Sequence, residues 1–290
     1  MPRGRMGKSG TARNCVSFSG QSSQSVTSGA DSMNGQALKA ALNGGECVYG
    51  AMFVQTRVGN GDHRLREMGL NFVIVDNEHA PYSRSETAGW MRKLGASGIV
   101  PMVRVPIPAS HYVTMALDAG AQGILAPYVE RVEQVQEVVG AAKYLPLKGE
   151  ALHRAVTTGE FPSEETRRHL EERNKNNVLI IGIESTAALE RLDELVSVPG
   201  VDAAFVGPND LSIQLGIPAD YDHPRYLEAV DHVFDTCRDK GVSLVIHFFS
   251  HEMAQPWIER GICFILYGSD RRGIGDAMKQ DLDFLRSLEA

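Results

Sequence analysis

One short stretch of the sequence changes abruptly from apolar residues to side chains that could do chemistry. The run FVIV at residues 72–75 is followed at once by Asp76, Glu78 and His79. Two carboxylates and an imidazole, with no Lys or Arg beside them in the sequence, are costly at the end of a buried strand unless they have a role there. An imidazole oriented by a carboxylate can move a proton. We therefore expect His79, with Asp76 behind it, to act as a general acid/base pair.

Five other apolar runs lead to polar side chains in the same way. They reach Arg104, Glu184, Asn209 with Asp210, His247, and Ser269 with Asp270. An Arg at the end of a buried strand is costly unless an anion or a carboxylate meets it. Glu184 and Asp210 also have a simpler interpretation, because each precedes a predicted helix and an acidic residue there can cap its N-terminus. Both interpretations stay open at this point.

The two carboxylates on successive strands suggest a metal site. Glu184 and Asp210 supply oxygen ligands and leave several coordination positions open, which favours Mg2+, Mn2+ or Co2+ over a structural zinc. A cation held there could bind an α-keto acid through its keto oxygen and one carboxylate oxygen, and act as a Lewis acid. Arg104 could stabilise the developing oxyanion while His79 moves the proton. These residues predict chemistry through an enolate.

The segments that carry these residues alternate between short apolar runs and amphipathic helical patterns, as in repeated βα units. The eight candidate strands span residues 48–54, 72–78, 100–105, 123–129, 178–184, 203–210, 243–248 and 264–270. Eight βα units in about 245 residues predict an α/β fold, one closed (β/α)8 TIM barrel. Because the carboxyl ends of the strands form the active site of this fold, the polar residues would meet at one mouth.

Two segments stand apart from this repeat. Residues 1–34 are rich in Ser, Gly and Arg and have little apolar surface to bury, so we expect a disordered leader, for which organelle targeting is an open alternative. Residues 46–290 are predicted to form the single barrel domain. Within it, residues 146–177 form a long, charged insert with a predicted helix at 165–174, and such inserts usually serve as a lid or a subunit contact.

The composition excludes several classes of protein. The 29 Lys and Arg residues are outnumbered by 36 Asp and Glu residues, which argues against a nucleic-acid partner. No run of eighteen apolar residues is present, so we expect no membrane span. The four cysteines, Cys15, Cys47, Cys237 and Cys263, are widely spaced without a CxxC pair. This pattern favours reduced, buried thiols in a cytoplasmic protein.

Six motifs together resemble a known family. They are DNEHAP, VRVP, LDAGAQGILAPYV, IES, PGVDAAFVGPNDLSIQLG and the final GSD. Over residues 46–288 they resemble the HpcH/HpaI aldolases, which act on 4-hydroxy-2-oxo-heptane-1,7-dioate and whose relatives include 2-keto-3-deoxy sugar acid aldolases and macrophomate synthase. The resemblance implies a divalent-metal-dependent lyase that reversibly cleaves a 4-hydroxy-2-oxo acid into pyruvate and an aldehyde through a metal-bound enolate, without a Schiff-base lysine.

The same resemblance implies a role for each candidate residue. Glu184 and Asp210 would be the metal ligands, and Arg104 would bind pyruvate and stabilise its enolate. His79, with Asp76 behind it, would act through a water molecule. The substrate would also meet the backbone of the segment that follows the sixth strand, and the seventh strand. The substrate-binding residues there would be Gly207, Pro208, Asn209 and His247.

Three departures from the family pattern concern the second substrate. Gly182 stands where these aldolases commonly have Gln, the segment LPLKGEALHRAV replaces a basic glycine-rich one, and strand seven carries the bulky His247. Three alternatives to an aldolase therefore stay open: oxaloacetate decarboxylation, a macrophomate-synthase-like addition of the enolate to an unsaturated acceptor, and a barrel that binds a keto acid without catalysis.

The resemblance finally implies a homo-oligomer, dimer-based and possibly hexameric, in which C-terminal helices pack between subunits. The C-terminal segment carries an apolar stripe that a lone barrel would leave exposed. The stripe consists of Ala277, Met278, Leu282, Leu285 and Leu288. The simpler alternative is a helix that packs on its own barrel.

Overall fold

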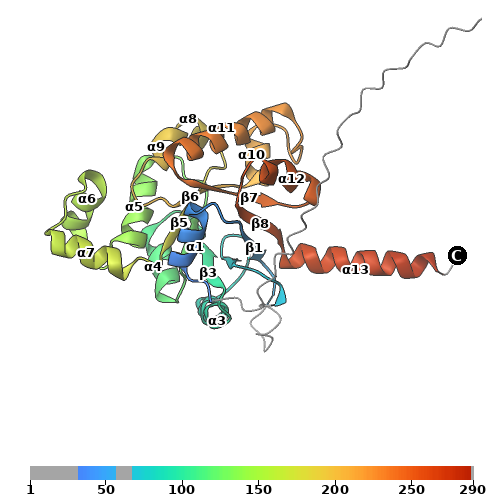
Figure 1. Ribbon diagram of the computed structural model, residues 1–290, viewed down its shortest axis with the longest axis horizontal. Helices are drawn as coiled ribbons and strands as arrows, with labels where there is room; N and C mark the ends of the chain where they lie inside the picture. The colour runs from blue at the N-terminus through green and yellow to red at the C-terminus, as the bar shows by residue number, and fades with distance from the viewer. Residues whose placement is uncertain (1–31, 57–66, 289–290) are drawn as a thin grey trace, which may run out of the picture. The chain divides into compact units, whose positions relative to one another are not determined.

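The computed structural model describes residues 32–56 and 67–288, so all but the last three positions of the predicted leader lie outside the described residues. Eight parallel strands pair in chain order and close on themselves (Figure 1). The strands are β1 (Val48–Phe53), β2 (Phe72–Asp76), β3 (Val100–Arg104), β4 (Gly123–Ala126), β5 (Val178–Gly182), β6 (Ala203–Val206), β7 (Ser243–Phe248) and β8 (Phe264–Ser269). The predicted (β/α)8 barrel is confirmed.

Most helices lie between successive strands and cover the outside of the barrel, while the first precedes the first strand and the last extends away from the barrel (Figure 1). They are α1 (Gly35–Asn43), α3 (Arg84–Ala96), α4 (Ser110–Asp118), α5 (Val132–Lys143), α6 (Gly149–Thr158), α7 (Glu164–Arg173), α8 (Thr186–Glu190), α9 (Leu192–Val196), α10 (Pro208–Gln214), α11 (Pro224–Lys240), α12 (His251–Glu259) and α13 (Asp270–Ser287).

Every strand begins at the predicted residue, but seven of the eight end earlier than predicted. The largest error is at β6, which ends at Val206 rather than at residue 210. Pro208 has no N–H to donate to a strand ladder, and its fixed φ suits the first turn of a helix. The chain therefore turns into α10 there, and Asp210 lies in the first turn of that helix.

The interior of the barrel is filled by large side chains from alternating strand positions, and α1 closes the end opposite the strand carboxyl termini. Leu38 of α1 is fully buried in the same cluster as Phe72 and Phe264. The side chain of Asn34 caps α1 by accepting the N–H of Ala37 at 2.9 Å. α1 lies before residue 46, the predicted start of the barrel domain. The core of the barrel therefore includes a helix that the predicted boundary left out.

The seam between β1 and β8 has an irregular ladder, with a register shift between Gly50 and Met52. At the carboxyl ends of these two strands, the Asp270 carboxylate accepts three backbone N–H groups. They belong to Val54, at 2.8 Å, Gln55, at 3.2 Å, and Thr56. Burial raises the pKa of Asp270, but these hydrogen bonds outweigh it, so the net pKa is lowered. Asp270 thus fastens the loop after β1 to the start of α13.

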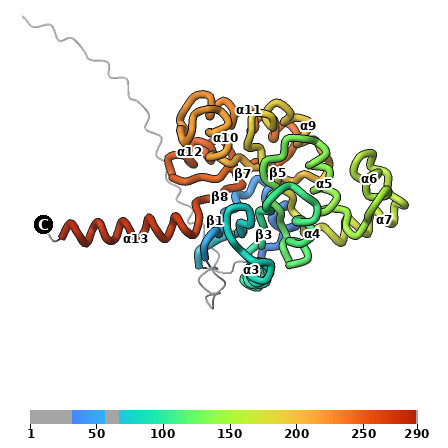
Figure 2. The backbone as a smooth tube through the Cα atoms, turned by 180° about the vertical axis from the view of Figure 1, so that it is seen from behind, coloured from blue at the N-terminus to red at the C-terminus, as the bar shows by residue number. Residues whose placement is uncertain are grey.

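The charged insert forms two helices, α6 and α7, and the helix predicted at 165–174 is confirmed as α7. Figure 2 shows α6 and α7 beyond α5 on the outer side of the barrel. Leu152 of α6 packs against Gly140 of α5, where an added Cβ would lie 3.3 Å from its side chain. The Asn174 side chain donates to the carbonyls of Lys143 and Leu145, at 3.0 and 2.9 Å, and so holds the end of α7 to the barrel.

The C-terminal helix α13 buries none of its described residues, and no other helix lies beside it in Figures 1 and 2. Its exposed apolar side chains, with Leu288 just beyond its end, are Ile274, Met278, Leu282, Phe284, Leu285 and Leu288. The alternative in which this helix packs on its own barrel is therefore wrong for the described residues. Across residues 32–56 and 67–288, no helix combines the length and the apolarity needed to cross a membrane.

Candidate active site

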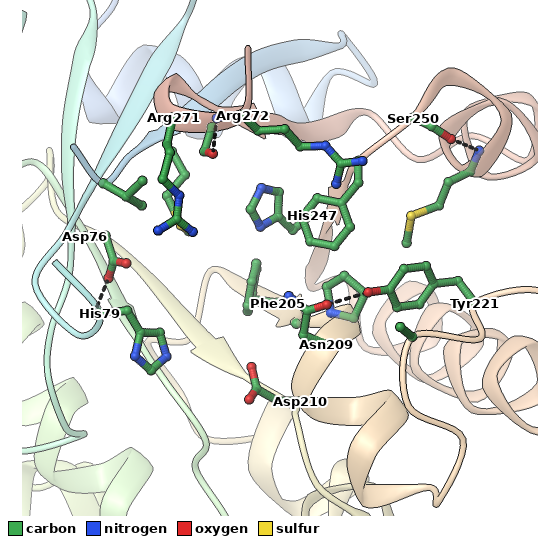
Figure 3. Close-up of a pocket in the computed structure, with 18 of the residues that line it drawn as sticks. Asp76, His79, Phe205, Asn209, Asp210, Tyr221, His247, Ser250, Arg271 and Arg272 are labelled. Carbon is green, nitrogen blue, oxygen red and sulfur yellow. Dashed lines mark hydrogen bonds between the residues drawn. The ribbon is translucent and has the colours of Figure 1, made fainter. Parts of the chain in front are cut away.

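The residues that the sequence singled out converge at the carboxyl ends of the strands, around a cavity of about 620 Å³ (Figure 3). Those that line it are Asp76, His79, Arg104, Gly207, Pro208, Asn209, Asp210 and His247. Glu184 lies directly beside this cavity, because a Cβ added to Gly207 would lie 2.2 Å from its Oε1. Residues from five different strands and the turns after them thus build one site, as expected for this fold.

Asp76 and Arg104 form a buried, bidentate ion pair. Arg104 Nε donates to Asp76 Oδ1 at 2.8 Å, and Arg104 Nη2 donates to Oδ2 at 2.7 Å. Burial raises the pKa of Asp76, but the Arg104 hydrogen bonds and charge outweigh it and hold the net pKa below its ordinary value. Glu78 contacts the third nitrogen, with its Oε2 3.1 Å from Arg104 Nη1. The guanidinium is thereby fixed in one orientation at the end of β3.

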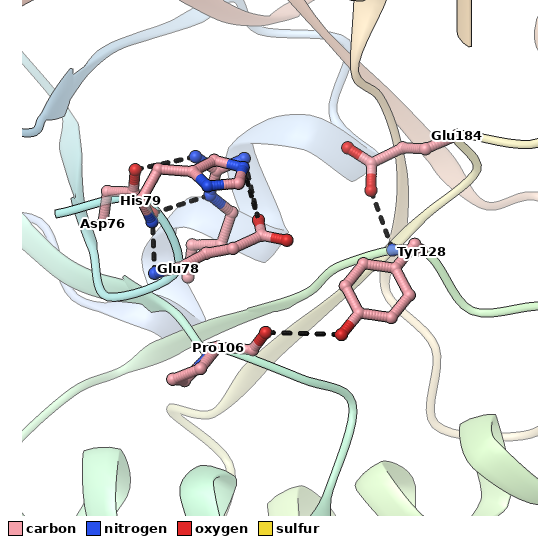
Figure 4. Close-up of polar contacts among 7 residues, drawn as sticks. Asp76, Glu78, His79, Pro106, Tyr128 and Glu184 are labelled. Atoms are coloured by element: carbon pink, nitrogen blue, oxygen red, sulfur yellow. Dashed lines mark hydrogen bonds and ion pairs between the residues drawn. The ribbon is translucent and has the colours of Figure 1, made fainter. Parts of the chain in front are cut away.

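The partner of the His79 ring differs from the one expected. Asp76 accepts the backbone N–H of His79 at 3.4 Å, whereas the imidazole Nε2 lies 3.8 Å from Glu78 Oε2 (Figure 4). Among the described residues, Glu78 is thus the carboxylate nearest the ring. Burial raises the pKa of Glu78 above its ordinary value, although Arg104 and His79 act to lower it. The sequence analysis noted Glu78 in the same stretch as Asp76 and His79, but it did not predict that Glu78 would be the carboxylate beside the His79 ring.

Glu184 is a buried carboxylate whose two oxygens have different surroundings. Its Oε2 accepts the backbone N–H of Tyr128 at 2.8 Å, while its Oε1 is buried without a hydrogen-bond partner in the described part of the chain (Figure 4). Burial raises the pKa of Glu184 to about 7. The N–H of Tyr128 is held by an uncommon backbone conformation, with φ at +34°, of the kind that clusters at functional sites. No side-chain signal in the sequence could have revealed this backbone donor.

Neither metal-ligand candidate caps a helix. Ser185 is the N-cap of α8 and accepts the N–H of Ala188, so Glu184 does not have that role. Gly207 is the N-cap of α10, and Asp210 lies three residues further on with its side chain turned toward the cavity (Figure 3). The capping interpretation of both acids was therefore wrong.

The donor set around Glu184 and Asp210 fits a hard divalent cation. Both side chains offer carboxylate oxygens, one of them buried and unpartnered, and the charge of Asp210 contributes to the raised pKa of Glu184. No third His, Cys, Asp or Glu joins them within the described residues. The remaining coordination positions would therefore be left to substrate and water, as in an open, catalytic site.

Gly182 leaves no room for a side chain in the present arrangement. A Cβ added there would lie 2.8 Å from Glu184 Oε2 and 2.9 Å from the Tyr128 nitrogen. A longer residue at this position would displace the carboxylate or the Tyr128 loop. The space beside Gly182, where the resembling aldolases commonly carry Gln, is taken up here by the contact between Glu184 and Tyr128.

The far half of the cavity is lined by residues of the last two βα units. His247 is buried and its Nε2 lies 2.8 Å from the Gly268 carbonyl oxygen, and burial lowers its pKa to about 4. Arg271 and Arg272, from the first turn of α13, line the same cavity, and the Arg272 guanidinium lies 5.3 Å from the ring centre of Phe249. The sequence interpretation missed both arginines, although they directly follow the GSD motif.

Comparisons with known proteins agree on the family and the fold. The matching family model is described as HpcH/HpaI aldolase/citrate lyase and covers residues 52–275. A 2-keto-3-deoxy-L-rhamnonate aldolase of Escherichia coli O9:H4 (strain HS) is 29% identical over 223 residues, which are 76% of this chain and 82% of that protein. A 5-keto-4-deoxy-D-glucarate aldolase of Enterobacter sp. (strain 638) is 30% identical over 205 residues, which are 70% of this chain and 78% of that protein.

Among solved structures, an HpcH/HpaI aldolase from Desulfitobacterium hafniense DCB-2 has a TM-score of 0.75 and 29% identity, and the alignment covers 86% of this chain and 96% of that one. The expected resemblance and the expected enzyme class, a carbon–carbon lyase, are both confirmed. Because the family model spans residues 52–275, most of the chain, the chain belongs to the HpcH/HpaI aldolase/citrate lyase family.

Proposed function

We propose that this protein is a divalent-metal-dependent aldolase that reversibly cleaves a 4-hydroxy-2-oxo acid into pyruvate and an aldehyde. The observation that carries the proposal is the buried, unpartnered Oε1 of Glu184, which lies beside a cavity that Asp210 and Arg104 also line. A buried carboxylate oxygen without a partner is costly unless a cation meets it. Glu184 and Asp210 would hold Mg2+, Mn2+ or Co2+, and the cation would polarise the keto carbonyl of the substrate.

The residues of the chain supply the rest of the chemistry. Arg104, oriented by Asp76, offers a fixed positive charge to the carboxylate and to the keto oxygen of the substrate. The N–H groups of Asn209 and Asp210, in the first turn of α10, have no partner inside the helix. They can donate to the second carboxylate oxygen of the substrate. The keto acid is thus bound at its charged end, with its third carbon turned toward the mouth.

Proton transfer is assigned to His79, whose side chain is 64% exposed at the mouth. In the cleavage direction the imidazole, through a water molecule, takes the proton of the substrate 4-hydroxyl, and the bond between carbons 3 and 4 breaks. The aldehyde leaves, and the electron pair remains on pyruvate as an enolate whose charge Arg104 stabilises. The same imidazole can return the proton to the methyl carbon.

Exchange of the pyruvate methyl protons with solvent deuterium tests this proposal without knowledge of the aldehyde. We expect exchange with Mg2+, Mn2+ or Co2+ and none after chelation. Glu184→Ala should abolish it, whereas Glu190→Ala, at an exposed acid at the end of α8, should leave it unchanged. A wild-type protein that exchanges no protons with any of the three cations would refute the proposal. If exchange is observed, a panel of aldehydes with pyruvate would identify the second substrate.

Oxaloacetate decarboxylation is a second candidate, because it forms the same pyruvate enolate. Arg271 and Arg272 line the same cavity, and their positive charges suit a keto acid with a second carboxylate, such as oxaloacetate. Release of CO2 from oxaloacetate that is faster than aldol cleavage of every 4-hydroxy-2-oxo acid tested would favour this candidate. Slow decarboxylation beside rapid aldol cleavage would favour the first.

We also propose that the protein is a homo-oligomer, dimer-based and possibly hexameric, in which α13 packs against a second copy. The six exposed apolar side chains at the C-terminus form a surface of the kind that usually marks an interface. Light scattering should show an oligomer for the wild type and a smaller species for the double variant Leu282→Asp, Leu285→Asp. A monomeric wild type at micromolar concentration would refute this assignment.

A further inference from the structure

Two cysteine side chains lie side by side at the end of the barrel that faces away from the candidate active site. Cys47 directly precedes β1 and Cys263 directly precedes β8, and their Sγ atoms are 3.0 Å apart. Cys47 is exposed and Cys263 is partly exposed, whereas Cys237 is buried. The expectation of uniformly buried cysteines was therefore wrong. Neither thiol has a role in the chemistry proposed above.

The strand register holds the two cysteines at the distance that a disulfide requires. Val48 is paired with Phe264, and its N–H donates to the Cys263 carbonyl at 2.8 Å. Cys47 and Cys263, one residue earlier on each strand, therefore lie opposite each other. Neighbouring strands lie about 4.8 Å apart, which falls within the range of Cα separations in disulfides, about 4.4 to 6.8 Å. A bond between the two sulfurs therefore requires side-chain rotation but no shift of the strands.

We propose that Cys47 and Cys263 form a reversible intramolecular disulfide when the protein meets a low-molecular-weight disulfide such as oxidised glutathione. The Cys47 thiolate attacks one sulfur of the reagent, forms a mixed disulfide and releases one thiol. The Cys263 sulfur then attacks Cys47, loses its proton and displaces the second thiol. The protein gives up two electrons and two protons, and the reagent is reduced to two thiols, so the exchange balances.

The environment of each sulfur fits this order of attack. Cys47 is exposed, so a reagent in solution can reach it. Cys263 is the more enclosed of the two, and its thiol lies 3.6 Å from the Gly45 carbonyl oxygen as a donor. Burial and the neighbouring Cys47 raise the pKa of Cys263 to about 11, so this thiol is almost entirely protonated near neutral pH and is a poor first nucleophile.

The disulfide would fasten the seam at which the barrel closes. β1 and β8 are joined by a ladder with a register shift, and Asp270 fastens only its upper end. The two cysteines are 216 positions apart in the sequence, so the bond would restrict the unfolded chain over most of its length. We expect the oxidised protein to be more resistant to unfolding, with an unchanged active site at the other end of the strands.

Peptide mapping and thermal unfolding after incubation with oxidised glutathione test the proposal. The wild type should yield a peptide that links Cys47 to Cys263, and its melting temperature should rise by about 5 to 10 °C, reversibly with a dithiol reductant. Cys237→Ala is the matched control and should show the same link and the same rise on oxidation, from a lower starting melting temperature because Cys237 is buried. Cys47→Ser and Cys263→Ser should show neither the link nor the rise.

Two outcomes would overturn the proposal. One is a stable mixed disulfide on Cys47 while Cys263 remains a free thiol. The other is a link from either residue to Cys15, Cys237 or a second chain in place of the intramolecular bond. Because the mapping reads the covalent bond in the wild-type protein, neither result depends on the folding of a variant or on the proposed aldolase activity.

Discussion

Gly207 is the position at which the smallest substitution should have the largest effect on the site. A Cβ added there would lie 2.2 Å from Oε1 of Glu184, and 3.0 and 3.2 Å from its Cδ and Cγ. The backbone of Gly207 has φ −87° and ψ 102°, which alanine adopts without strain. Gly207→Ala therefore tests a single effect, the displacement of the Glu184 carboxylate.

The size of the effect follows from that distance. A carbon and an oxygen that are not bonded need roughly 3.4 Å, so the Glu184 carboxylate must retreat by about 1 Å. A misplacement of about 1 Å in a catalytic constellation costs about 100-fold in rate, which corresponds to about 2.7 kcal/mol. We expect the rate of pyruvate methyl proton exchange in the Gly207→Ala variant to fall by about this factor and the affinity for Mn2+ to fall with it.

Two measurements on folded protein check this prediction. Electron paramagnetic resonance of free Mn2+ gives the metal affinity, and deuterium incorporation into pyruvate gives the rate of the chemical step. The control is Gly95→Ala, because a Cβ at Gly95 meets no atom within 4 Å and this helical position favours alanine. If Gly207→Ala bound Mn2+ and exchanged methyl protons like the wild type, Glu184 would not be the metal ligand and the proposed site would be wrong.

The remaining predictions concern single side chains of the same cavity. His79→Ala should slow methyl proton exchange by about two to four orders of magnitude, the worth of one positioned acid/base, while Mn2+ binding survives. Glu184→Ala and Asp210→Ala should each remove the metal and leave the fold intact, as metal analysis and circular dichroism would show. Because burial lowers the pKa of His247 from 6.5 to about 4, the unfolded chain binds the proton more readily. This residue should therefore lower the stability by up to about 3 kcal/mol as the pH falls from 6.5 to 4, which urea unfolding of the wild type and His247→Gln would measure.

Each of these predictions has a contrary outcome. Turnover of His79→Ala close to that of the wild type would remove the residue from the chemistry. Wild-type metal content in both carboxylate variants would place the cation elsewhere. Stability curves of the wild type and His247→Gln that run parallel between pH 6.5 and 4 would mean that His247 is as easily protonated in the folded protein as in the unfolded chain.

The sequence predicts the barrel well because the core of each strand depends on local composition. The apolar, β-branched runs begin where the chain enters the core, and this is why all eight strand starts were predicted. The ends were harder, since several runs, such as those that reach Val54, Val105 and Val129, stay apolar after the ladder has stopped. In the run from Gly123 to Val129 the ladder ends at Ala126, because Pro127 has no N–H to donate.

The candidate site was predictable as a set of residues but not as a set of contacts. The alternation within a strand does not say whether Asp76 or Glu78 faces His79, because Glu78 lies beyond the last paired residue of β2. The partner of Asp76, Arg104, is 28 positions away, and only the register of β2 and β3 brings the two together. The Tyr128 N–H that binds Glu184 is a backbone group, which no residue type announces.

The closure of the barrel by its first and last strands has a consequence for how the protein is made. At about 5 to 20 residues per second, a ribosome needs about 10 to 40 seconds to add the 216 positions from Cys47 to Cys263. During that time β1 has no β8 to pair with, and the growing sheet presents unpaired backbone groups at both edges. Nascent chains that stop before Phe264 should therefore be the aggregation-prone species, and chaperones that cover strand edges should bind them in preference to the finished barrel.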